Sequence, residues 1–175
     1  MVADAAAVRS LFEEVEGRLA PGRAWAEAAA RLEELWCTGL APNPVPDGFM
    51  RGRALLLSWS EPVDALARRV AGPHRRWEGK RFERGAARGV NVLRRPGGGP
   101  IDTVERFPFA MRVAPAATDP SRDVLAIDYD VPENPRWVRP VLDEAVEAAP
   151  GCFVGRIHLR WGASAHPVGF FALEA

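Results

Sequence analysis

The spacing of the apolar residues changes near residue 48, and this change limits the folds that the chain can adopt. Before it, apolar residues recur every three or four positions over 3–19 and 23–40, which predicts two amphipathic helices. After it, apolar residues alternate with polar ones, most clearly in 104–113, as they do in half-buried strands. We therefore predict an α+β fold with the helices first and an antiparallel sheet after them.

The second part of the chain is predicted to form about seven strands in sequence order. A sheet with so many strands in a small protein usually curls or closes into a barrel, because closure removes its edges. A further helix is predicted over 61–70, and another from Asn134-Pro135 to the stop at Pro150-Gly151, before the last two strands. The predicted strands are 49–58, 77–83, 89–94, 104–113, 123–131, 152–161 and 167–174.

The chain of 175 residues is predicted to be one domain, since a single core usually serves this length. The proline-rich segment 41–48 joins the helical segment 1–40 to a barrel-like body over 48–174. Proline stops the second helix, and the connector is too short to separate two independent domains.

The charge balance argues against two classes of partner. The chain has 23 Lys plus Arg and 23 Asp plus Glu, so no overall field attracts nucleic acid or an anionic membrane. The acidic N-terminal segment does not read as a signal peptide, and no stretch of about 20 apolar residues could span a bilayer. Cys37 and Cys152 do not make a secreted disulfide framework. We expect a cytoplasmic protein, and we leave open whether it forms a homodimer.

The motifs of three common site types are missing. No G-x-S-x-G sequence is present to supply a serine nucleophile. The histidines His74, His158 and His166 lack the spacing of zinc ligands. The glycine-rich loop 95–100 lacks the lysine and the hydroxyl residue of a phosphate-binding loop. The motifs therefore predict neither a metal nor a particular reaction.

Two glycine-containing segments carry a resemblance to a known family. They are Gly48-Phe49-Met50-Arg51-Gly52 and Trp77-Glu78-Gly79-Lys80-Arg81-Phe82. Together they resemble the GXWXG-type domain-of-unknown-function proteins, which are small bacterial barrels of calycin-like character, although Met50 stands where that family has its central tryptophan. The resemblance extends over 48–174 and implies a calycin-like β-barrel without implying an activity.

Three residues are candidates for contact with a ligand inside such a barrel. Tyr129, the only tyrosine, falls on the apolar side of its strand, and a buried hydroxyl needs a partner. Lys80 is the only lysine, and it is either an ordinary surface charge or an amine required at that position. Trp77 is expected to close one end of the barrel.

Basic side chains on two strands form a second set of candidates. Arg106 and Arg112 lie on one strand, and Arg156 and His158 on another, so that they could form a patch for an acidic ligand. The alternative is a solvated outer face paired with neighbouring acidic residues. Asp128 and Asp130 likewise read either as a pair for acid–base work or as a solvated strand face.

The function predicted first is the binding of a hydrophobic small molecule in the barrel, without a cofactor. One alternative is a cyclase-like or isomerase-like enzyme that uses Tyr129, an arginine and a carboxylate. Another is suggested by the nitrobindins, calycin-like barrels that hold haem through a histidine, which would here be His158. A structural interaction domain is a further alternative. Polar side chains that converge inside the barrel would favour chemistry, and an apolar interior would favour binding.

Overall fold

A computed structural model describes residues 4–16, 23–57, 77–95, 97, 102–162 and 164–175. The helix predicted over 61–70 and most of the glycine-rich loop lie outside these residues.

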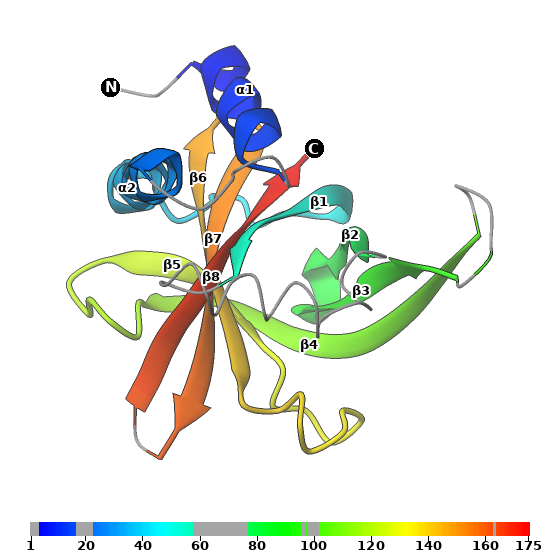
Figure 1. The fold of residues 1–175 in the computed structure, drawn as a ribbon. Coiled ribbons are helices and arrows are strands. Elements are labelled where there is room, and N and C mark those ends of the chain that lie inside the picture. The colour runs from blue at the N-terminus through cyan, green and yellow to red at the C-terminus, as the bar shows by residue number, and fades with distance from the viewer. Residues whose placement is uncertain (1–3, 17–22, 58–76, 96, 98–101, 163) are drawn as a thin grey trace.

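The described chain forms two helices followed by a closed antiparallel β-barrel (Figure 1). Each strand pairs with the next one in the sequence, and the last strand pairs with the first to close the barrel. A short 3-10 turn, Arg84–Ala86, joins β2 to β3. The elements are α1 Ala5–Val15, α2 Arg23–Thr38, β1 Gly48–Leu57, β2 Trp77–Glu83, β3 Arg88–Arg94, β4 Thr103–Pro115, β5 Asp123–Asp128, β6 Val141–Ala149, β7 Cys152–Trp161 and β8 Ser164–Glu174.

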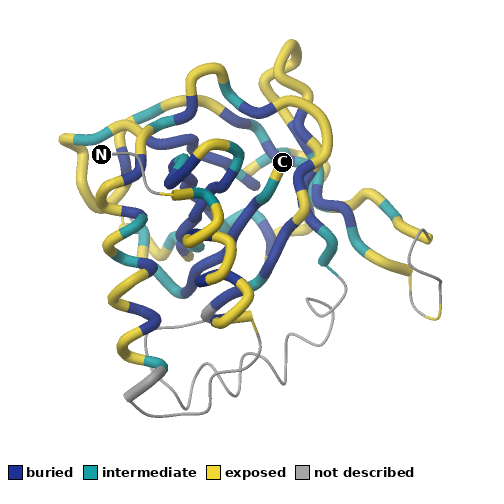
Figure 2. The backbone as a smooth tube through the Cα atoms, turned by 90° about the horizontal axis from the view of Figure 1, so that it is seen from above, coloured by how far each residue is buried: buried dark blue, intermediate teal, exposed yellow. Residues whose placement is uncertain are grey.

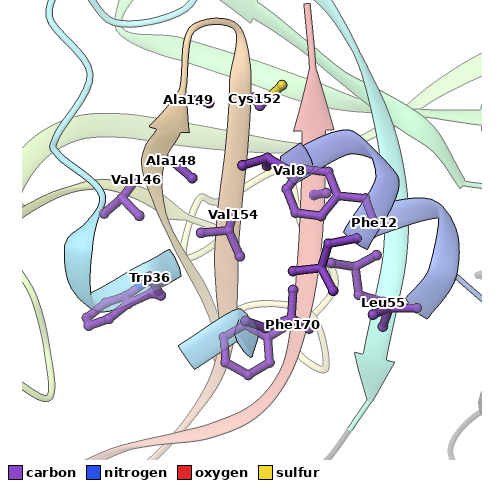
Figure 3. Close-up of a cluster of buried hydrophobic side chains, with 14 of the residues drawn as sticks. Val8, Phe12, Trp36, Leu55, Val146, Ala148, Ala149, Cys152, Val154 and Phe170 are labelled. Atoms are coloured by element: carbon purple, nitrogen blue, oxygen red, sulfur yellow. The ribbon is translucent and has the colours of Figure 1, made fainter. Parts of the chain in front are cut away.

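The two helices pack on the outside of the barrel, and an apolar core fills the space beneath them. Helix α1 contacts β1, β6 and β7, and α2 contacts β6 and β7. In Figure 2 the buried residues of α1 recur along one side of the helix, as the sequence pattern predicts. Figure 3 shows this outer core, in which Phe12 of α1 and Trp36 of α2 meet Val154 and Phe170 of the barrel wall. None of the described helices is long and apolar enough to cross a bilayer.

A second core of apolar side chains lies in the interior of the barrel. It is formed by the inward-facing residues of successive strands, among them Met50, Phe82, Phe109, Ile127 and Phe171. The strands beneath the helices are therefore buried on both faces, one against the interior and the other against α1 and α2. Because one sheet has an apolar core on each of its faces, a chain of 175 residues can bury apolar side chains in two layers.

The predicted helix before the last two strands is wrong. The chain makes turns from 132 to 140 and then forms strand β6, Val141–Ala149. Seven of its nine residues are buried, because β6 has the barrel interior on one side and the helices on the other. This removes the period-two alternation, and the alanines and glutamates of the segment favour a helix intrinsically. Tertiary packing overrides that preference, and β6 is the strand that the sequence prediction lacked.

The two cysteines do not form a disulfide. Cys37 is exposed on α2, and Cys152 is buried at the start of β7. Both carry free thiols, and burial raises the pKa of the Cys152 thiol.

Candidate functional site

Four polar side chains meet inside the barrel, and we call them the interior polar cluster. Lys80 comes from β2, Asn91 from β3 and Asp143 from β6, while Tyr129 directly follows β5. The Lys80 ammonium is only 2% exposed and donates to Asp143 Oδ2 at 2.9 Å and to Asn91 Oδ1 at 3.1 Å. It also donates to the Tyr129 hydroxyl. The three donors of Lys80 are therefore all engaged within the barrel.

The cluster is linked internally as well as through Lys80. The Tyr129 hydroxyl donates to Asp143 Oδ2 at 3.2 Å and accepts from Asn91 Nδ2 at 2.9 Å. Asn91 Oδ1 also accepts from the Trp77 indole N–H at 3.0 Å. A network in which every member is satisfied holds each side chain in one orientation, because a buried polar group without a partner is costly.

A local irregularity in β2 directs two functional side chains inward. The β2–β3 register shifts between Trp77 and Gly79, and this bulge inserts one residue. Trp77 and Lys80 are an odd number of positions apart, so that a regular strand would place them on opposite faces. Gly79 has φ +148°, and a Cβ there would lie 2.0 Å from the carbonyl oxygen of Met50. Only glycine allows β2 to approach β1 in this way.

Four aromatic rings surround the Lys80 ammonium and form what we call the aromatic cage. The distances from Nζ to the ring centroids are 5.3 Å for Trp77, 5.2 Å for Phe109, 5.0 Å for Tyr129 and 5.3 Å for Phe171. Trp77 and Phe171 pack edge to face, as do Phe109 and Tyr129. Rings at this distance stabilise a cation and keep water away from it.

The surroundings shift the proton affinities of the cluster. Burial lowers the pKa of Lys80, and the negative charge of Asp143 opposes this effect. Burial, together with the charge of Asp143, raises the pKa of Tyr129 well above its usual value, so that the phenol keeps its proton. The barrel thus holds an amine, a carboxylate and a phenol within hydrogen-bond reach of one another, and such a set can bind a ligand oxygen or transfer a proton.

The structure brings together three of the residues singled out from the sequence: Tyr129, Lys80 and Trp77. Sequence reasoning missed Asn91 and Asp143. Asn91 left a signal in the sequence, because it is a lone amide between two valines. The structure places it opposite Lys80 in the β2–β3 register. Asp143 left none, since the alanines and glutamates of the segment around it favour a helix.

The predicted basic patch does not assemble. Arg106 and Arg112 are exposed on β4, and Arg112 lies 3.9 Å from Asp128. Strands β5 and β6 separate β4 from β7, which carries Arg156 and His158. Asp128 forms an ion pair with Arg160 and accepts a hydrogen bond from the backbone N–H of residue 130. Its carboxylate therefore binds groups on the outside of the barrel and is not part of the interior polar cluster.

Arg156 and His158 lie on the outer face of the barrel and are buried there. The Arg156 guanidinium lies 3.6 Å from the centroid of the Trp36 ring and forms an ion pair with Glu33 of α2. His158 has no exposed surface, and its Nε2 lies 3.7 Å from Glu144 Oε2. Burial, followed by the charge of Arg156, lowers the pKa of His158 to about 4.

The haem alternative does not fit this placement. An axial histidine needs an open side for the iron, whereas His158 is enclosed and faces away from the barrel interior. Among the described residues, no group of three or more His, Cys, Asp or Glu side chains is arranged to hold a metal ion.

Comparison with known proteins supports the fold. No family model matches the chain, and no curated protein shows significant sequence similarity to it. A crystal structure of a protein from Thermomonospora curvata superposes with a TM-score of 0.60 over 97% of both chains, at 21% sequence identity. At this identity the likeness shows that the two proteins share their overall fold.

Proposed function

We propose that the barrel binds a small hydrophobic molecule whose one polar group contacts the interior polar cluster. The observation that carries this proposal is the Lys80–Asp143 pair, which is buried with Asn91 and Tyr129 among the apolar side chains of the barrel interior. Removing an ion pair from water is costly, and well-packed apolar residues often serve stability equally well. A charged pair in the centre of a barrel is therefore best explained by recognition of a ligand.

The cluster and the cage would divide the work of recognition. The rings of Trp77, Phe109 and Phe171 offer flat apolar contacts to the body of the ligand. Lys80 and Tyr129 offer an N–H and an O–H to its polar end. All donors of Lys80 are already engaged, so a ligand oxygen would replace the neutral Asn91 amide oxygen, the least strongly bound of its acceptors.

The second candidate function is acid–base catalysis on a similar molecule, of the cyclase or isomerase type. It is favoured by the convergence of Tyr129, Asp143 and Lys80 inside the barrel, since an interior made for binding alone needs fewer ionisable groups. The resemblance to the GXWXG-type proteins is compatible with both functions. Its two motif segments pair with each other, with Gly48 opposite Phe82 and Arg51 opposite Gly79.

Native mass spectrometry of freshly purified protein tests the proposal, together with titration of 1-anilinonaphthalene-8-sulfonate, an aromatic anion that fluoresces in apolar sites. We expect a retained small molecule, or saturable binding of the dye. Tyr129→Phe should weaken binding about five- to tenfold, the value of one hydrogen bond. Arg112→Ala, on the exposed face of β4, is the matched control and should bind like the wild type. Equal affinities for all three proteins would contradict the proposal.

A further inference from the structure

We propose that Lys80 is a reactive amine that captures an aldehyde or ketone inside the barrel as an imine. This inference rests on the proposed function, because capture requires that a small molecule enter the barrel. It narrows the ligand class to hydrophobic molecules that carry a carbonyl group.

The first support is the choice of residue at position 80. Lys80 is the only lysine in a chain that has 23 Lys plus Arg, so every other basic side chain of this kind is an arginine. A guanidinium would pair with the Asp143 carboxylate through two hydrogen bonds and keep its charge at every accessible pH. An amine can lose its proton and attack a carbonyl carbon, which a guanidinium cannot do.

The second support is the position of a proton acceptor and a proton donor around the amine. Asp143 Oδ2 lies 2.9 Å from Nζ and can take the proton that the ammonium must lose. The Tyr129 hydroxyl contacts Nζ and lies 3.2 Å from the same carboxylate oxygen. Burial favours the neutral amine, which is the nucleophilic form. The three groups have the geometry of an activated nucleophile with its own acid and base.

The third support is the aromatic cage. Its four rings lie within 5.3 Å of Nζ, and they restrict the access of water to the amine. Exclusion of water matters because hydrolysis reverses imine formation. Gly155 makes room for one of these rings, since a Cβ at that position would lie 2.1 Å from Phe171 Cζ.

The step balances without a further reactant. The ammonium passes one proton to the Asp143 carboxylate, and the neutral Nζ forms a bond to the carbonyl carbon while the C=O π electrons move to oxygen. That oxygen takes a proton from the Tyr129 hydroxyl, and the nitrogen returns a proton to the phenolate, giving a carbinolamine. Asp143 then protonates the hydroxyl, which leaves as water as the nitrogen lone pair forms C=N. The products are a protonated imine, a carboxylate and one water molecule, with no change of oxidation state.

Reductive trapping tests this step with 2-naphthaldehyde and sodium cyanoborohydride at pH 7. The sole lysine makes the readout sharp, because the only other amine is the α-amine of the chain. Intact mass spectrometry counts the adducts, and peptide mapping assigns them to Lys80 or to the N-terminus. We expect an adduct on Lys80 in the folded protein, lost completely in Lys80→Arg and slower in Tyr129→Phe. Circular dichroism establishes that each variant is folded, and mapping of the wild type locates the adduct without any variant.

A parallel titration with 2-methylnaphthalene, which lacks the carbonyl, separates the two proposals. Binding of this hydrocarbon, or of the aldehyde, without an adduct on Lys80 would overturn the imine and leave the binding function standing. Labelling of the α-amine alone would have the same meaning. If the protein shows no binding and no labelling, both proposals are overturned.

Discussion

Replacing Asp143 by asparagine tests whether Lys80 is held as a buried ion pair. The substitution keeps the size of the side chain and removes its charge, so the Lys80 ammonium loses its counter-charge at a site that is 2% exposed. Breaking a buried pair by removing one partner typically costs about 3–5 kcal/mol of unfolding free energy. We expect a loss in this range at pH 7.

The structure also sets an upper limit to this loss. An ammonium without a counter-charge gives up its proton once that becomes cheaper than remaining charged. An unperturbed lysine has a pKa about 3.4 units above pH 7, and each unit is worth about 1.4 kcal/mol, so the loss cannot exceed about 5 kcal/mol. A lysine that is neutral when folded and charged when unfolded makes stability rise with pH. The deficit of the variant should therefore shrink by up to about 1.4 kcal/mol per unit between pH 7 and 10.

Urea denaturation followed by tryptophan fluorescence at pH 7, 8 and 9 measures both quantities. The matched control is the double variant Lys80→Met, Asp143→Leu, which removes both charges and should recover most of the lost stability. A loss below about 1 kcal/mol for Asp143→Asn, or one that does not change with pH, would refute the buried pair.

Four further substitutions test the packing and the outer face of the barrel. His158 has its pKa lowered from 6.5 to about 4, so the folded protein binds its proton less readily than the unfolded chain. The free energy of unfolding should therefore fall by up to about 3 kcal/mol between pH 6.5 and 4. Glu144, whose pKa is raised, opposes part of this fall. In urea titrations, His158→Leu should make the free energy of unfolding depend less on pH. Gly155→Ala should lower the midpoint of thermal unfolding by overpacking against Phe171, at a cost of about 1–3 kcal/mol, and adding Phe171→Leu should restore part of it. Trp36→Ala should cost about 3–5 kcal/mol, measured in the same way, because its ring is almost wholly buried between α2 and the barrel.

Local periodicity predicted most of the fold. The helical spacing over 3–19 and 23–40 corresponds to α1 and α2, and the predicted strands 77–83 and 152–161 have the bounds of β2 and β7. It failed at β6, where burial on both faces erased the alternation that marks a strand. Apolar periodicity identifies a strand or a helix only when one of its faces is buried and the other is exposed. When both faces are buried, the two element types give similar patterns.

The candidate site was predictable only where a residue stood out by itself. Tyr129 and Lys80 did so as the only residues of their types. Asp143 could not be found, because its role depends on pairing with a strand 63 residues away. The role of Arg156 is hidden from the sequence for a similar reason: its partner Glu33 is 123 residues away, on a helix whose docking the strand pattern does not encode.

The closure of the barrel has a consequence for the order in which it assembles. Among the described strands, every pair except one joins strands that follow each other in the sequence; the exception is β1 with β8, where Arg53 binds Glu174 across 121 residues. Closing a loop of that length costs about 4 kcal/mol of chain entropy before any contact rewards it. We therefore expect the pairing of β1 with β8 to form last during folding and to separate first during unfolding. Arg53 also forms ion pairs with Glu13 of helix α1 and with Glu16, which directly follows that helix. The helix therefore stabilises the pairing of β1 with β8 from outside the barrel.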